Sequence, residues 1–433
     1  KDLDLYAYVL LPASVSDGEI GRVVKWLDKN TNATKNPTGD LGNYFRNRTD
    51  IVTFKMDGID FSGVTNISYA FPLIGSLTSF PQIDTSNVTN WFYAFLNNTG
   101  LTSFPVLDTS NGTNFGYTWF GCSGLTSFPL LDTSSGTSFA YAWYNCTGLT
   151  SFPALDLSSG VSFQLAWYLC NNASFTSFPA VTFSTDAGDD INFQQAWMGC
   201  TGFTSFPALN LSRGTGFNQA WRDCTSLTTF PAIALTAGTD FGSAWRTCTS
   251  MTSFNATGLD SGTNFSFTWM SCDVLTSFPA IPLTAGTNFG YAWYDCDAMT
   301  SFNATGLDSG TDFTYAWGRC DTLASFPNIP LTAGTNFSLA WSFCYALTSF
   351  PAIPFVAGTD FQMAWVSCTA LTSFPAGVFD DWNPASVSTD CFLNTWDGCT
   401  ALTEQSVQNI LHSIAASGQS APSSGKEITI DSN

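Results

Sequence analysis

One block of sequence recurs along most of the chain and constrains the fold more than any other feature. "TNFGYAWYDCDAMTSFN" begins at Thr287, "TDFTYAWGRCDTLASFP" at Thr311 and "TNFSLAWSFCYALTSFP" at Thr335. The leucine of "LTSF", or an apolar replacement, recurs every 24 residues, except for steps of 26 and 28 near residues 171–192. A fixed period of this length is typical of a solenoid, in which each repeat stacks on its neighbours. About fourteen coils over residues 51–402 are therefore predicted.

Each coil combines two local patterns. "Phe-x-x-Ala-Trp-x-x-Cys" places apolar residues at i, i+3, i+4 and i+7, which is one face of a short helix. "Leu-Thr-Ser-Phe-Pro" is short, rich in strand formers and closed by proline, which predicts a short strand. The sequence thus predicts an α/β solenoid with one short strand and one short helix in each coil. The longer steps predict that residues 171–192 bulge from one edge of the array.

The tryptophans are predicted to form a continuous core column. A single coil cannot bury its leucine, two phenylalanines and tryptophan alone, but stacked coils can. Each fully buried large side chain stabilises the fold by roughly 1.5–3 kcal/mol. The repetition is therefore explained by structure. The predicted column consists of Trp119, Trp143, Trp167, Trp197, Trp221, Trp245, Trp269, Trp293, Trp317, Trp341 and Trp365.

The cysteines follow the same period. Twelve of the 13 lie three residues after a tryptophan, and only Cys391 and Cys399 share a coil. Equivalent cysteines on stacked coils point the same way, so we expect a ladder of buried thiols that pack as small apolar groups. The spacing does not fit a zinc site. A disulfide between Cys391 and Cys399 is left open.

Composition excludes several function classes. The formal net charge is −20, because 33 acidic residues face only 13 Lys and Arg, and this disfavours binding to nucleic acid or to anionic membranes. No apolar run approaches the ~20 residues that span a bilayer, so membrane insertion is not expected. The first residue is Lys1, which suggests a mature or trimmed product. His412 has no neighbouring nucleophile, and no catalytic residues are predicted.

The repeat resembles a known family of surface proteins. "GTNFGYAWYDCDAMTSF" is similar to the BspA-like type of leucine-rich repeat, and "DTSNVTN" at residues 84–90 is similar to related bacterial surface repeats. In this chain Trp mostly replaces the usual Phe, and Phe-Pro replaces Ile. The resemblance covers residues 51–402 and implies a leucine-rich-repeat-like solenoid in an extracellular protein. It is unspecific to function, because such repeats occur in adhesins, lipoproteins and phage proteins.

The two ends do not repeat. Residues 1–50 read as an alternating strand followed by an amphipathic helix near residues 20–27. They resemble the end of a laminin-G or concanavalin-like lectin domain, and such a domain joined to a repeat array is frequent in phage fibre proteins. We expect them to form an N-terminal cap, a remnant of such a domain. Residues 403–433 predict a cap helix at 404–414 and then a tail. This tail is similar to those of tail-fibre and surface proteins of marine phages and bacteria.

Two sets of side chains are candidate binding sites. The first is a row of acids, which either form Asx turns or bind calcium, the one cofactor left open. The acids are Asp84, Asp108, Asp132 and Asp156. The second set lies two or five residues after the repeat phenylalanine and is predicted to face outward, where it would contact a partner. This set consists of Tyr117, Tyr141, Tyr144, Tyr168, Tyr291, Tyr294 and Tyr315.

These observations predict a non-enzymatic extracellular protein at the surface of a virion, such as a phage tail fibre. A bacterial cell-surface adhesin and a lattice or sheath subunit are the alternatives. Expected partners are other virion or surface-layer subunits, further copies of this chain in a homo-oligomer, and a host-cell surface protein or glycan.

Overall fold

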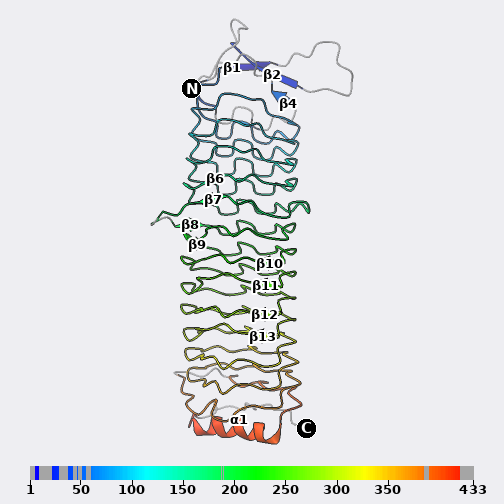
Figure 1. The fold of residues 1–433 in the computed structure, drawn as a ribbon, viewed down its shortest axis with the longest axis vertical. Coiled ribbons are helices and arrows are strands. Elements are labelled where there is room, and N and C mark those ends of the chain that lie inside the picture. Colours follow the sequence, from blue (N-terminus) through cyan, green and yellow to red (C-terminus); the bar gives the residue numbers. More distant parts are fainter. Residues whose placement is uncertain are drawn as a thin grey trace. The chain divides into compact units, whose positions relative to one another are not determined.

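The structure is a computed structural model that describes residues 5–8, 22–28, 38–41, 46, 51–54, 60–186, 188, 190–384 and 390–419. The chain divides into two compact units, residues 1–210 and 211–433. Within each unit the chain winds in coils that stack on one another (Figure 1). Regular elements are few and short, because most of each coil consists of turns and extended segments.

In unit 1 the strands are β1 (Leu5–Tyr8), β2 (Arg22–Asp28), β3 (Thr38–Asp40), β4 (Ile51–Phe54), β5 (Gly63–Asn66), β6 (Asp156–Leu157), β7 (Thr182–Phe183) and β8 (Ile191–Asn192). Unit 2 contains β9 (Gly214–Gly216), β10 (Thr229–Phe230), β11 (Ser253–Phe254), β12 (Ser277–Phe278), β13 (Ser301–Phe302) and the helix α1 (Glu404–Ala416).

The N-terminal segment differs from the prediction. β1 pairs with β2 in antiparallel fashion, and β2 pairs with β4 in parallel. Residues 22–28 are therefore a strand, and the predicted helix near residues 20–27 is wrong. "RVVKWLD" is rich in β-branched and aromatic residues, and pairing with two strands outweighs its weak helical periodicity.

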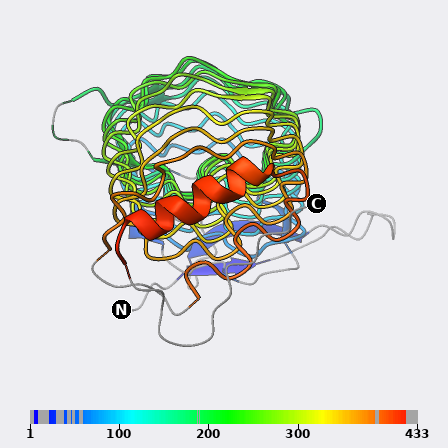
Figure 2. The same ribbon diagram turned by 90° about the horizontal axis from the view of Figure 1, so that it is seen from below.

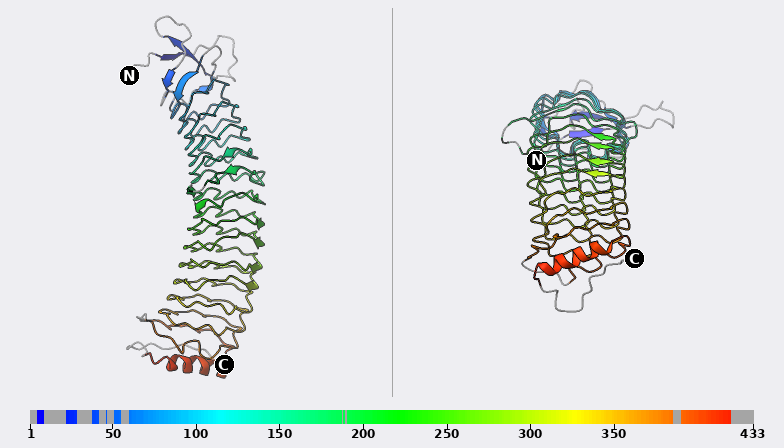
Figure 3. Two further views of the ribbon diagram at one scale, coloured as in Figure 1. Left: turned by 60° about the vertical axis from the view of Figure 1, so that its left-hand side comes forward. Right: turned by 60° about the horizontal axis from the view of Figure 1, so that its bottom comes forward.

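Parallel pairing with a 24-residue register connects the coils. In unit 1 a bridge joins Asn66 to Asn90, and the next joins Asn90 to Asn114. In unit 2, β10 pairs in parallel with β11, and β12 pairs in parallel with β13. These four strands come from the "LTSF" segments and stand in one column (Figure 3). The predicted strand is thus present in these coils, although it is only two residues long.

The predicted short helix in each coil is wrong. In the coil that begins at Phe313, the N–H groups of Ala316, Gly318 and Cys320 donate to the carbonyls three residues earlier, which makes consecutive turns. The intervening N–H groups donate to the next coil; Trp317, for example, donates to the carbonyl of Ala340 at 2.8 Å. A helix would keep these donors inside its own segment. The turns direct inward the same apolar side chains that the predicted helix would have buried. Their remaining N–H groups connect adjacent coils.

Left-handed backbone recurs in these turns. Tyr315 has φ 53° and Arg319 has φ 59°, and the equivalent positions of other coils are also left-handed. A side chain at such a φ costs roughly 1–2 kcal/mol relative to an ordinary conformation. The inter-coil hydrogen bonds and the buried core offset this cost.

The core of each unit is a stack of aromatic rings. All eleven predicted tryptophans are fully buried. In unit 1 the ring centroids of Trp119 and Trp143 lie 5.5 Å apart, with 7° between the planes. Phe128 packs edge-on against Trp119 at 4.8 Å, so stacked and edge-to-face contacts alternate through the core.

The helix α1 covers the last coils of unit 2 (Figure 2). It begins after Thr403, whose hydroxyl accepts from the N–H of Ser406. Ser406 and Ser413 in turn accept from the backbone N–H groups of Phe374 and Phe379, at 3.0 and 2.7 Å. The helix predicted at residues 404–414 is therefore present, and its side chains satisfy backbone donors of the last coil.

Candidate functional site

The tyrosines of unit 1 form stacked columns. Tyr93, Tyr117 and Tyr141 occupy one position in successive coils, with ring centroids 4.4 and 4.3 Å apart and 8° between planes. Tyr144 and Tyr168 form a second column, 4.7 Å apart. These rings belong to one half-buried patch, the aromatic face. It consists of Tyr69, Phe92, Tyr93, Tyr117, Phe120, Tyr141, Tyr144 and Tyr168.

Stacking determines which part of each ring a ligand can reach. A ring with parallel neighbours on both sides, such as Tyr117, presents its edge and hydroxyl rather than its π face. Burial, followed by the neighbouring Tyr141 and Tyr93, raises the pKa of Tyr117 well above its ordinary value. The Tyr117 phenol therefore remains a neutral donor and acceptor. The aromatic face offers rows of ring edges and hydroxyls.

The coils that carry the aromatic face are almost free of charge. Residues 61–185 contain no Lys, Arg, His or Glu, and their only charged side chains are Asp84, Asp108, Asp132 and Asp156. In each of these coils the segment from the repeat phenylalanine or tryptophan to the cysteine position, for example residues 139–146, is entirely uncharged. The aromatic face therefore contains no charged side chain of its own on a strongly acidic chain, and one cation meets it at its first ring, where the guanidinium of Arg46 lies 5.9 Å from the ring centroid of Tyr69.

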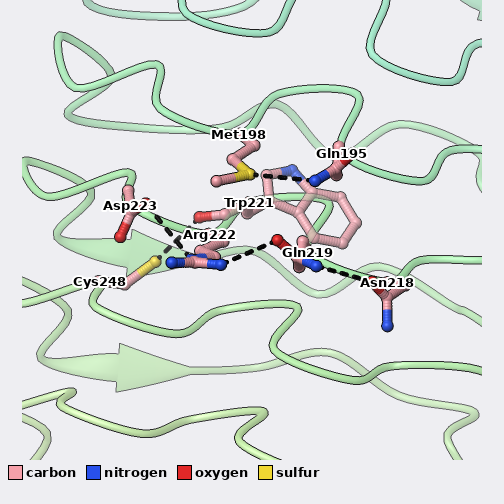
Figure 4. Close-up of polar contacts among 8 residues, drawn as sticks. All are labelled: Gln195, Met198, Asn218, Gln219, Trp221, Arg222, Asp223 and Cys248. Atoms are coloured by element: carbon pink, nitrogen blue, oxygen red, sulfur yellow. Dashed lines mark hydrogen bonds and ion pairs between the residues drawn. The ribbon is translucent and has the colours of Figure 1, made fainter.

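Several of the corresponding segments of unit 2, such as residues 217–224 and 313–320, contain charged side chains. Arg222 occupies the position equivalent to Tyr144, and its Nη1 donates to Gln219 at 2.9 Å while Asp223 lies 3.4 Å from its Nε (Figure 4). Farther along the unit, Arg319 lies 3.3 Å from Asp295.

The predicted tyrosines of unit 2 lie among these charged groups. Tyr291 and Tyr315 stack at 4.7 Å, and Tyr294 packs edge-on against Tyr315 at 5.4 Å. Burial, then Tyr294 and Asp312, raise the pKa of Tyr291. The seven predicted tyrosines thus fall into two sets, one in neutral and one in charged surroundings.

The row of acids forms turns. Asp84, Asp108, Asp132 and Asp156 are exposed, and each carboxylate accepts the backbone N–H two residues later, at 3.0–3.1 Å. This is the geometry of an Asx turn. Among the described residues, no three acidic, His or Cys side chains come together as a group that could hold a metal ion. The structure thus accounts for the four acids by local backbone capping.

The cysteines also have a structural role. All 13 lie in the described part of the chain, all are buried, and none forms a disulfide, including Cys391 and Cys399. The Cys146 thiol donates to the carbonyl of Trp119 at 3.2 Å, and the same contact recurs along the ladder. Burial raises the pKa of Cys170 to about 12, so these thiols are poor nucleophiles.

The sequence interpretation missed a column of exposed hydroxyls. The threonine of "LTSF" points outward in nearly every coil, and in many coils its Oγ1 donates to the carbonyl at the same position one coil earlier, as from Thr150 to Thr126 at 3.0 Å. The hydroxyl column consists of Thr78, Thr102, Thr126, Thr150, Thr176 and Thr204 in unit 1, and of Thr228, Thr252, Thr276, Thr300, Thr348 and Thr372 in unit 2. The signal was the pair of polar residues between two apolar ones in most repeats.

No family model and no curated protein matches the chain. Among solved structures, it is similar to a leucine rich cell surface protein of Faecalibacterium prausnitzii A2-165, with 16% identity and a TM-score of 0.37 over 86% of this chain and 93% of that chain. A leucine-rich repeat protein of Bacteroides ovatus ATCC 8483 shows 12% identity and a TM-score of 0.32, over 92% and 91% of the two chains.

An internalin of Listeria monocytogenes str. 4b F2365 shows 12% identity and a TM-score of 0.27, over 77% of this chain and 80% of that chain. Similarities this low add nothing to the repeat architecture described above. Within the described residues, no helix has both the length and the apolar character that crossing a membrane requires.

Proposed function

We propose that this chain is a non-enzymatic extracellular surface protein that serves in assembly and adhesion. The observation that supports this most directly is the repetition of outward side chains. Thr102, Thr126 and Thr150, for example, present the same hydroxyl in three successive coils, with the rotamer held by the coil before. A surface of this kind multiplies one weak contact many times, which raises the overall affinity for a repetitive target.

The more specific proposal is a virion component, such as a phage tail fibre that contacts a host-cell surface protein or glycan. It rests on the resemblance of both chain ends to phage proteins. A bacterial cell-surface adhesin is the second candidate, favoured by the resemblance of the "DTSNVTN" segment to bacterial surface repeats. A lattice or sheath subunit is the third. The domain organisation that goes with these proposals is a cap at 1–50, the array at 51–402 and a cap with tail at 403–433.

Location and adhesion are tested separately. Antibodies against the full chain, used in immunogold microscopy, should label virions; label on cell walls alone would favour the bacterial adhesin. Labelled full chain should bind host cells more strongly than a variant that lacks residues 275–322 and so presents fewer repeated contacts. Equal binding by the two folded proteins would contradict multivalent adhesion.

A further inference from the structure

The aromatic face is a large surface whose role the proposed function does not explain. Tyr93, Tyr117 and Tyr141 are half-buried, and so are the flanking rings of Phe120 and Tyr144. Polar side chains would suffice at positions that face only solvent. A contiguous aromatic surface that solvent can reach usually marks a contact with another molecule. A partner of this face has to fit a ridged surface of ring edges that contains no charged side chain of its own.

Charge limits the choice of partner. The chain carries a net charge of −20, so a second copy is repelled wherever acids from the two molecules face each other. The segments that carry the aromatic face contain no charged side chain, whereas the equivalent segments of unit 2 contain Arg222, Asp223, Asp295 and Arg319. The aromatic face is therefore a surface on which two like-charged copies can meet without placing acid against acid.

The pitch of the ridges favours the same partner. The stacked rings repeat at 4.3–4.7 Å along the columns, as shown by the pairs Tyr69–Tyr93, Tyr117–Tyr141 and Tyr144–Tyr168. A second copy carries ridges with an identical repeat, so ridge and groove remain matched over the four coils from Tyr69 to Tyr141. A glycan binds tyrosine through the π face, and neighbouring rings cover both π faces of Tyr93, Tyr117 and Tyr144.

We propose that the aromatic face is the contact between two copies of this chain, related by a twofold axis so that the same patch serves on both sides. In such an isologous contact, the tyrosine edges of each copy enter the grooves of the other, and the phenol groups exchange hydrogen bonds. Interfaces of this kind depend on a central cluster of aromatic anchors. Two copies can meet in this way whether the chain is displayed on a virion or on a cell.

Sedimentation of the full chain from nanomolar to high micromolar concentration tests the proposal. The wild-type chain should change from monomer to dimer. A variant with Tyr117→Ser, Tyr141→Ser and Tyr144→Ser should dissociate at least about tenfold more readily, because it loses three anchors. The matched control, with Tyr291→Ser, Tyr294→Ser and Tyr315→Ser, should dimerise as the wild type does.

A second measurement does not depend on how well the variants fold. Concentration-dependent nitration of the wild-type chain, read by mass spectrometry, should show Tyr117 and Tyr141 protected on dimerisation and Tyr291 unchanged. Three results overturn the proposal: a wild-type chain that stays monomeric, equal weakening by both triple variants, or protection of Tyr291 with Tyr117 unchanged. Loss of glycan binding with unaltered dimerisation in the unit 1 variant would instead assign the face to a glycan.

Discussion

The indole rings of Trp293 and Trp317 lie parallel, with centroids 5.4 Å apart and 7° between their planes, although 24 residues separate them in sequence. Phe302 packs edge-on against both rings, at 4.8 and 5.4 Å. Each tryptophan therefore contacts the coil before and the coil after its own. The stability of a coil is shared with its neighbours rather than held within it.

Replacing Trp293 by alanine should lower the free energy of unfolding by about 3–5 kcal/mol, the usual cost of an emptied aromatic site. The control is Tyr294→Ala, one residue later and half-buried, which should cost clearly less. Urea unfolding followed by near-ultraviolet circular dichroism gives both values. Equal losses would show that the indole column is not the principal core.

The 24-residue register predicts that two coils can be removed together. "MTSFNATGLDSGT" begins at both Met251 and Met299, so deleting residues 275–322 recreates a junction that the chain already contains. We expect a folded, shorter solenoid whose cooperative unfolding persists. The control deletion, residues 275–310, removes one and a half coils and should not fold. Failure of the 48-residue deletion would reveal contacts beyond adjacent coils.

Left-handed backbone offers a way to stabilise the protein. Thr247 has φ 62°, a conformation that a β-branched residue adopts at a cost and asparagine tolerates better. Thr247→Asn should raise the free energy of unfolding by up to about 1 kcal/mol. The matched control is Thr225→Asn, at an equivalent surface level but without a positive φ, and it should give no gain. A loss at Thr247 would show that its methyl group contributes packing.

The buried thiols predict loss of stability in alkali. Burial raises the pKa of Cys122, Cys170 and Cys344 from 9.0 to about 12. Below pH 9 the thiols are protonated in both the folded and the unfolded chain, so their contribution to the free energy of unfolding is complete. Above it the unfolded chain releases protons that the folded chain keeps, and stability falls until pH 12 is reached.

Each such thiol contributes a slope of about 1.4 kcal/mol per pH unit in that range. Unfolding free energies measured from pH 8 upward should therefore decline, and Cys170→Ala should flatten the decline while lowering the value at pH 8. Cys170 should also resist iodoacetamide in the folded chain. Rapid alkylation at pH 8 would contradict the burial on which the prediction rests.

The acid row can be tested at Asp132, whose carboxylate accepts from both the N–H and the hydroxyl of Ser134. Asp132→Asn keeps an acceptor oxygen and should change stability little, whereas Asp132→Ala should cost about 0.5–1.5 kcal/mol. Added Ca²⁺ should leave the melting temperature unchanged if the acids only form turns. A melting temperature that rises with Ca²⁺ in wild type but not in Asp132→Ala would assign them a metal.

The period, the buried residues and the cap helix could be predicted because each depends on apolar spacing that is visible in one dimension. The conformation of the segment from the phenylalanine to the cysteine could not be predicted in the same way. Residues at i, i+3, i+4 and i+7 share one face in consecutive turns as well as in a helix, so the spacing does not distinguish the two. Asn97, Gly121, Asn145 and Asp295, all left-handed, were a usable signal, since such residues at one fixed position interrupt a helix. The charge difference between the two sets of tyrosines is visible in the sequence, but the stacking of their rings into columns is not, because it depends on the turns that the sequence did not predict.

The contact between α1 and the last coil limits how such a chain can change in length. Ser406 and Asn409 bind backbone groups of residues 372–374, and Ser413 binds Phe379, so the edge on which a further coil would form is already occupied. A coil added there would displace the helix and lose every one of these bonds. Gene duplication can therefore not add a coil at this edge without displacing α1, and the repeated "MTSFNATGLDSGT" segments lie in the interior. The same closed edge keeps strands of other molecules from adding at this end.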